Sequence, residues 1–236
     1  MIKSSRTLLV CGAIFAMSAT AWGGVTYSVD GGLTTTSTSW SGAPAIALAT
    51  PSQGNVPEGG NTGGGVVGIA FFATSSFTLG ELKFETTAVA NGNNVSLAMY
   101  NLGPTVSGTN PRYTIDGSSV NLFSAGLNFT YTTGASHITS LVFDGADQVS
   151  IVAGNYYTIE LLNNDLNTNI LIERASTALD AFMALGTGAT GSRVNVPAGD
   201  RDPVAAIYAV PEPSALALAG VGLMNLFARR QARGRK

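Results

Sequence analysis

Short segments in which apolar and polar residues alternate run through most of this 236-residue chain. In the clearest of them, Val95, Leu97 and Met99 alternate with polar or small residues. This period of two places successive side chains on opposite faces of a β-strand. The same pattern, interrupted by Gly, Asn, Asp and Ser turns, predicts strands over residues 25–29, 66–72, 76–86, 94–102, 121–123, 127–132, 137–143, 148–152, 156–162, 169–174 and 204–210.

One segment departs from the strand pattern. Over residues 176–186, the apolar residues Ala178, Leu179, Phe182 and Met183 have the spacing of a helix face, which predicts one short helix. The remaining body consists of many short strands with turns between them, which is typical of a sandwich. The sequence therefore predicts an all-β fold, a single jelly-roll-like antiparallel β-sandwich over residues 22–209.

The beginning of the chain has the pattern of a secretory signal peptide. Residues 1–6 form a short segment with two basic residues, residues 7–18 are mostly apolar, and Ala19-Thr-Ala21 supplies the small residues that signal peptidase reads. The apolar run is shorter than the roughly twenty residues that a membrane-spanning helix needs. We expect cleavage after Ala21, with Gly23 as the alternative position, so residues 1–21 are assigned to the signal peptide.

The end of the chain combines two prolines, an apolar run and a basic cluster. Pro211 and Pro213 flank Glu212 and prevent a helix from starting before Ser214. A short hydrophobic helix over 214–228 would be about 22 Å long. Because a bilayer core is about 30 Å thick, this helix is too short to span it fully, and we expect the segment to hold the protein in the inner membrane only temporarily. The basic cluster, which the positive-inside rule keeps cytoplasmic, consists of Arg229, Arg230, Arg233, Arg235 and Lys236.

The three parts of residues 210–236, in this order, resemble the PEP-CTERM sorting signal, the substrate tail of the exosortase system. The resemblance implies export, a hold in the inner membrane, and processing by an exosortase-type enzyme near Pro211-Glu212-Pro213. It also implies an exopolysaccharide-producing bacterium, with the processed protein on the cell surface or in the extracellular matrix of a biofilm. The body, over 68–102 and 156–162, resembles jelly-roll modules that are similar to carbohydrate-binding β-sandwiches. Exosortase, signal peptidase and exopolysaccharide are the expected partners.

The charged residues are distributed unevenly between the body and the ends. Between residues 22 and 209 there are five basic residues against thirteen acidic ones. Nucleic acid is not an expected partner, because so acidic a body lacks the basic surface that binds phosphates. The single cysteine, Cys11, lies in the signal peptide, so the mature body has neither a disulfide nor a reactive thiol.

The body offers little catalytic chemistry. His137 is its one histidine, and no serine shows a nucleophile-elbow pattern. We therefore expect no enzyme. The alternative is a secreted glycan-active hydrolase, which needs two carboxyl groups about 5–10 Å apart. The strand-borne candidates are Glu81, Glu85, Glu160 and Glu173.

Glycan binding without catalysis would need aromatic side chains on a face or loop. The candidates are Trp40, Tyr156 and Tyr157. Because Tyr156 and Tyr157 are adjacent, they point to opposite faces of their strand, and one of them can be exposed.

Oxygen-rich loops raise the question of a structural calcium ion. Asp, Asn and backbone oxygens are ligands that Ca²⁺ accepts, although turn formation explains the same residues. We expect no cofactor. The loops concerned are residues 144–147, 163–165 and 200–202.

Overall fold

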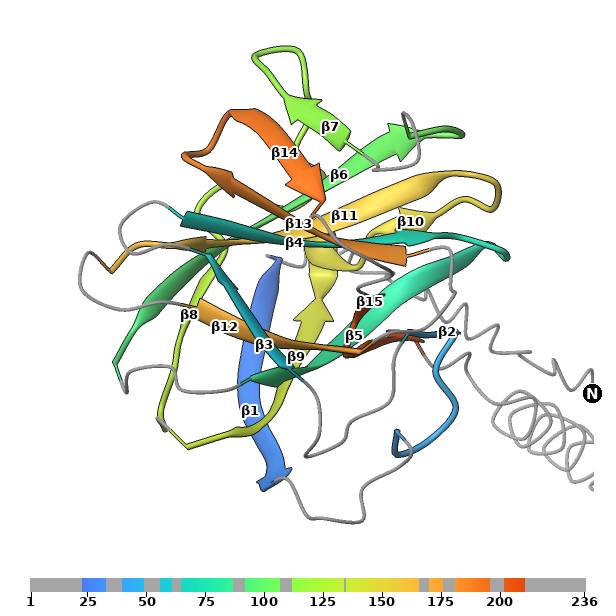
Figure 1. Cartoon of the computed structure of the whole chain (residues 1–236). Coiled ribbons are helices and arrows are strands. Elements are labelled where there is room, and N and C mark those ends of the chain that lie inside the picture. The colour runs from blue at the N-terminus through green and yellow to red at the C-terminus, as the bar shows by residue number, and fades with distance from the viewer. Residues whose placement is uncertain are drawn as a thin grey trace, which may run out of the picture.

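The computed structural model describes residues 23–32, 40–48, 56–60, 65–86, 92–106, 112–133, 135–165, 170–175, 181–195 and 202–210. The predicted signal peptide and the predicted C-terminal helix lie outside these residues. The described chain forms two antiparallel sheets, which confirms the all-β prediction, and Figure 1 shows them as two layers. The jelly-roll connectivity remains a prediction. Where the structure describes the chain, it contains no helix with the length and hydrophobicity to cross a membrane.

The first sheet is centred on strand β5, which pairs with β9 along one edge and with β16 along the other. Strand β1 lies beyond β9, and β2 lies beyond β16. Strand β12 continues the sheet past Thr86 and carries β3 and β15. The strands are β1 (Gly24–Gly32), β2 (Ile46–Ala47), β3 (Val56–Gly60), β5 (Phe77–Thr86), β9 (His137–Asp144), β10 (Ser150–Ile151), β12 (Ile170–Ala175), β15 (Asp202–Pro203) and β16 (Ala205–Ala209).

The second sheet has the order β7-β14-β13-β4-β11-β6-β8. Its central strands, β4 and β11, are buried along almost their whole length, so both of their faces are covered. This explains why β4 reads as a continuous run of apolar and small residues rather than an alternation. The strands are β4 (Gly65–Phe72), β6 (Asn94–Gly103), β7 (Arg112–Ile115), β8 (Asn128–Thr130), β11 (Tyr156–Asn163), β13 (Ala181–Thr187) and β14 (Gly191–Asn195).

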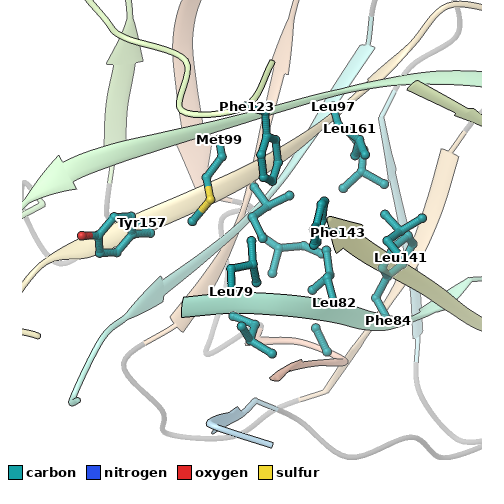
Figure 2. Packing of buried hydrophobic residues seen from close by; sticks show 14 of the residues in the cluster. Leu79, Leu82, Phe84, Leu97, Met99, Phe123, Leu141, Phe143, Tyr157 and Leu161 are labelled. Carbon is teal, nitrogen blue, oxygen red and sulfur yellow. The ribbon is translucent and has the colours of Figure 1, made fainter. Parts of the chain in front are cut away.

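One hydrophobic core lies between the two sheets (Figure 2). The second sheet contributes the alternating residues of β6, among them Leu97 and Met99, and the first sheet contributes Leu82 from β5. The rings of Phe123 and Phe143 stack with their centroids 4.9 Å apart. Burial of these apolar side chains is the main stabilising contribution that holds the two layers together.

Two predicted elements are corrected by the structure. The predicted helix over 176–186 is wrong where the chain is described, because β13 is a strand. The adjacent residues Phe182 and Met183 of β13 pack into separate buried clusters on opposite faces of the sheet. Because both faces of this strand are buried, its apolar residues do not alternate with polar ones, and their spacing resembles that of a helix. Residues 121–123 are not a strand. Instead, the Asn121 side chain accepts a hydrogen bond from the Met99 N–H at 2.9 Å.

Both ends of the described body emerge at one end of the first sheet. Gly24 in β1 pairs with Asp144 at the end of β9, and Ala209 in β16 pairs with Leu79 near the start of β5. Since β5 and β9 are antiparallel, these positions lie at the same end. Three strand spacings separate β1 from β16, which places Gly24 and Ala209 about 14 Å apart.

Candidate functional site

Strands β7 and β14 fold back over the outer face of the second sheet. We call residues 112–115 and 191–195 the β7–β14 cover; Figure 1 shows these strands standing out from the rest of their layer. A second buried apolar cluster joins Tyr113 of the cover to Phe182 and Ala184 of β13 beneath it. The cover therefore turns an outer sheet face, which would otherwise meet solvent, into a small interior.

A buried ion pair joins the cover to β11. The Arg193 Nε donates to Glu160 Oε1 at 2.9 Å and Nη2 donates to Oε2 at 3.0 Å, while both side chains are almost completely buried. Arg193 Nη2 also donates to the carbonyl of Gly188 at 2.9 Å. Two parallel bonds between a guanidinium and a carboxylate fix both distance and angle. The pair therefore sets where β14 sits on β11.

Tyr113 of β7 completes this polar cluster. Its hydroxyl donates to Glu160 Oε1 at 3.0 Å and lies 2.9 Å from the Thr158 hydroxyl. Burial, followed by the charge of Glu160, raises the pKa of Tyr113 well above its usual value. The same two causes raise the pKa of Tyr100 on β6. Both phenols thus remain hydrogen-bond donors at neutral pH.

Two glycines make room for the cover. A Cβ at Gly186 would lie 2.5 Å from Arg193 Cδ, and one at Gly68 would collide with the Tyr113 hydroxyl. The side chains of the polar cluster lie directly on the backbone of β4 and β13. Glycine at these positions is therefore a packing requirement of the cover.

A groove lies at the margin of the cover, between the end of β6 and β7. Its volume is about 370 Å³, which falls within the range of small-ligand sites. It combines two phenols, an arginine and hydroxyl groups with four aliphatic side chains, a set suited to hydroxyl-rich ligands. The lining includes Tyr100, Leu102, Arg112, Thr114, Ser119 and Val120.

A second hollow, of about 580 Å³, lies on the outer face of the first sheet where the described chain ends. Glu81, Val142, Tyr208 and Val210 are among its lining residues. The Val210 N–H donates to the Thr78 carbonyl at 2.8 Å, so the sheet hydrogen bonds continue to the residue before Pro211. No spacer separates the folded body from the Pro-Glu-Pro segment.

The aromatic residues that the sequence suggested as glycan contacts take different places. Trp40 is buried against Val204 and Ala206 on the outer side of the first sheet. Tyr156 is half-buried beside the β7–β14 cover, whereas Tyr157 is in the main core. The opposite orientation of the two tyrosines is therefore confirmed. Trp40 and Tyr157 are corrected as glycan platforms, because buried rings offer no face to a ligand.

The three candidate glutamates whose side chains are described do not form one site. Glu160 is held by Arg193, and Glu81 accepts a hydrogen bond from Ser140 and pairs with Lys83. Glu85 is buried in the same strand as Glu81, four residues away, which is about 13 Å along a strand and more than a glycosidase pair needs. The side chain of Glu173 lies outside the described residues.

His137 and the described parts of the oxygen-rich loops make local hydrogen bonds that stabilise the fold. His137 is buried, its Nδ1 donates to the Ala135 carbonyl at 2.6 Å, and its Nε2 lies 3.1 Å from the Thr139 hydroxyl. Among the described side chains, no group of three His, Cys, Asp or Glu could hold a metal. The Asn163 side chain accepts from the Asp165 N–H at 3.0 Å, an ordinary turn contact. In the loop 200–202 only Asp202 is described, as part of β15.

Sequence reasoning missed the polar cluster of Arg193, Glu160 and Tyr113. The available signal was a charged residue inside an apolar strand pattern, Glu160 between Ile159 and Leu161. A buried carboxylate of this kind requires a partner, and Arg193 is one of only five basic residues in the body. The identity of this arginine could not be predicted, because the sequence pattern does not show that β14 folds back over β11.

Comparison with known protein families matches residues 209–233 to the PEP-CTERM protein-sorting motif. No curated protein and no solved structure matches the chain. The matched segment begins inside β16, at Ala209, so the motif and the folded body overlap. The chain is thus a secreted protein that carries the PEP-CTERM sorting motif, which directs it across the inner membrane to the cell surface or extracellular space and to an exosortase-type processing enzyme.

Proposed function

We propose that this protein is a non-enzymatic component of the extracellular matrix of an exopolysaccharide-producing bacterium, and that its β-sandwich binds a glycan of that matrix. The observation that carries the proposal is the sorting motif joined directly to the last core strand. A tail of this kind delivers the folded body to the cell surface. The body must therefore do its work there with the groups it displays.

The groove beside the β7–β14 cover is the proposed glycan site. Tyr100 offers a partly exposed ring and a protonated hydroxyl, and Arg112 and Thr114 of β7 also line the groove. Aromatic rings suit the apolar faces of sugars, while arginine and hydroxyl groups bind their oxygens. Because the body is acidic overall, Arg112 is also the feature that would admit a uronate or another acidic sugar.

The C-terminal segment is proposed to hold the protein in the inner membrane until it is processed. A helix over 214–228 is shorter than the hydrocarbon core of a bilayer, which disfavours it as a permanent transmembrane helix. The arginine-rich end keeps the segment oriented with the body outside. Cutting near Pro211-Glu212-Pro213 would then release the body with β16 intact.

Glycan retention tests this function directly. The full chain without its signal peptide, kept in mild detergent, is applied to the immobilised exopolysaccharide of the producing cells. Arg112→Gln and Tyr100→Leu should each reduce retention about tenfold, the loss expected for one good polar or stacking contact. Lys83→Gln, on the outer face of the other sheet, is the control and should leave retention unchanged.

Two results would contradict the proposal. Retention equal to that of an unrelated β-sandwich, or equal retention by all variants, would rule out the groove as a glycan site. New reducing ends in the same incubation would instead favour a glycan-active hydrolase. Glu160 and Glu81 are each held by a basic partner, which makes that second outcome unexpected.

A further inference from the structure

A buried carboxylate lies beside the place where the exported body begins. Asp147 ends the short 3₁₀ turn η1 (Gly145–Asp147), which follows β9, and its side chain is completely buried. Its Oδ1 accepts a hydrogen bond from the Ser124 N–H at 2.6 Å. Its Oδ2 is also buried and has no hydrogen-bond partner among the described residues. A carboxylate oxygen enclosed in this way is strongly destabilising unless a cation or donor reaches it.

The chain that precedes β1 passes directly over this oxygen. A Cβ built at Gly23 would collide with Asp147 Oδ2 and lie 2.8 Å from the Ser124 hydroxyl. A Cβ at Gly24 would lie 3.0 Å from an oxygen of Asp144. Only a chain without side chains at this point can approach the carboxylates so closely. The backbone at Gly23 therefore lies beside Asp147 Oδ2 and the Ser124 hydroxyl.

The sequence predicts that signal peptidase cuts at this same place, after Ala21 or after Gly23. The cut hydrolyses one peptide bond: water gives its hydroxyl to the carbonyl carbon of the leader and a hydrogen to the amide nitrogen. The new amine takes up a further proton at neutral pH. Successive Cα atoms are about 3.8 Å apart, so either cut creates a positive charge within reach of Asp147.

We propose that the buried carboxylate of Asp147 binds the α-ammonium group that signal-peptide cleavage creates. The ligand is the mature N-terminus of this same chain, a primary ammonium ion. It donates to Asp147 Oδ2 and lies close to the Ser124 hydroxyl, with Asp144 adding negative charge at the rim. The uncleaved precursor has an uncharged peptide bond at this point. The body therefore gains this ion pair only after export and cleavage.

The proposal has a consequence for the order of events at the membrane. The ammonium site and the start of the sorting motif lie at the same end of the first sheet. The ion pair that forms after export therefore lies near β16, the strand that leads into the tail. The inference depends on the signal peptide, and not on the proposed glycan function.

Titration of the α-amine is the direct test. The exported, cleaved full chain is purified in detergent, its first residue is identified by mass spectrometry, and its amines are methylated reductively with ¹³C-formaldehyde. We expect the α-amine to titrate about one pH unit or more above its ordinary range of about 7.7–8.0. Asp147→Asn should return the midpoint to that range, whereas Asp116→Asn, the control at an exposed carboxylate in the turn after β7, should leave it raised. Equal midpoints in the parent chain and in Asp147→Asn would overturn the proposal.

A second measurement covers the case in which Asp147→Asn does not fold. Acetylation of the α-amine in the parent chain removes its positive charge, and should lower Tm by about 4–8 °C. An unchanged Tm would overturn the proposal. So would a rise in Tm on adding Ca²⁺ that EDTA reverses, because that result would assign the carboxylates to a metal ion.

Discussion

Arg193 of β14 and Glu160 of β11 face each other as a buried two-point ion pair, with N–O distances of 2.9 and 3.0 Å. Thirty-three residues separate them in the sequence. The pair lies outside the main core, beneath strands that pair with the rest of the sheet through only two residues of β13. Because the ladder is so short, the position of the β7–β14 cover depends on this pair and on the small cluster around it.

Removing one partner of the pair should be costly. Arg193→Leu leaves the Glu160 carboxylate buried without a cation and should lower the free energy of unfolding by about 3–5 kcal/mol. Glu81→Gln, at a partly buried pair with Lys83 near the surface, should change it by less than about 1 kcal/mol. Urea denaturation measures both, and a similar loss in the two variants would contradict this account. The double variant Arg193→Met with Glu160→Leu should recover most of the lost stability.

Two buried tyrosines should respond differently to the loss of their hydroxyl. Tyr113→Phe removes the donor to Glu160 and should cost about 1.5–3 kcal/mol. Tyr131 is equally buried, but its hydroxyl makes no hydrogen bond of good geometry among the described residues. Tyr131→Phe should therefore be neutral or slightly stabilising. Thermal unfolding of the two variants side by side makes the comparison, which fails if Tyr131→Phe is the more damaging.

Stability should fall at alkaline pH. The pKa of Tyr113 is raised well above 10 by burial and by Glu160, and burial also raises the pKa of Tyr131. Above about pH 10, the unfolded chain loses these phenol protons while the folded chain keeps them, so unfolding becomes easier as pH rises. The stabilisation is complete below pH 10, and Tyr113→Phe should flatten the decline. Urea midpoints measured between about pH 8 and 11.5 give the decline of stability with pH. If Tyr113→Phe leaves that decline unchanged, Tyr113 is not its cause.

The glycines beneath the cover should not tolerate a methyl group. Gly186→Ala places a Cβ 2.5 Å from Arg193 Cδ and should cost at least about 2 kcal/mol, since the ion pair would have to move. Gly117→Ala, where a Cβ would meet nothing within 4 Å, is the matched control and should stay within about 0.5 kcal/mol of the parent. Equal effects in denaturant unfolding would show that the cover adapts without strain.

The junction between body and tail should be sensitive to Gly80. A Cβ at this position would lie 2.8 Å from the Val210 backbone nitrogen, so Gly80→Ala should push the start of the sorting motif off β5. Loss of the Val210–Thr78 hydrogen bond should speed amide exchange at Val210 and expose the Pro-Glu-Pro segment to faster processing in cells. Gly117→Ala again serves as the control. Processing that is unchanged or slower would mean that the enzyme accepts the junction in its folded form.

Strand positions in this body could be predicted where one face meets the core and the other meets solvent. β6 is the best example, since Val95, Leu97 and Met99 alternate with outward residues. The prediction failed in β13, where both faces are buried and the alternation disappears. Strands β3, β7 and β14 were not predicted, because they are short and rich in Gly or polar residues.

The candidate site was harder to predict than the fold. The tail motif could be recognised because its information is local: three residues, an apolar run and a basic end in fixed order. The groove and the buried ion pair depend on β7 and β14 lying over β11, which joins segments far apart in the chain. Alternation assigns a side chain to a face, but it does not show that another strand will cover that face. Glu160 was accordingly considered a catalytic candidate instead of a structural anchor.

The sorting tail continues from a strand inside a sheet. β16 pairs with β5 over five residues and with β2 on its other side. Antiparallel ladder bonds run perpendicular to their strands, so a pull along the tail loads those between β16 and β5 together, in shear, instead of peeling them one by one. While the tail still holds the protein in the inner membrane, a pull on it would therefore be borne by the whole β16–β5 ladder at once.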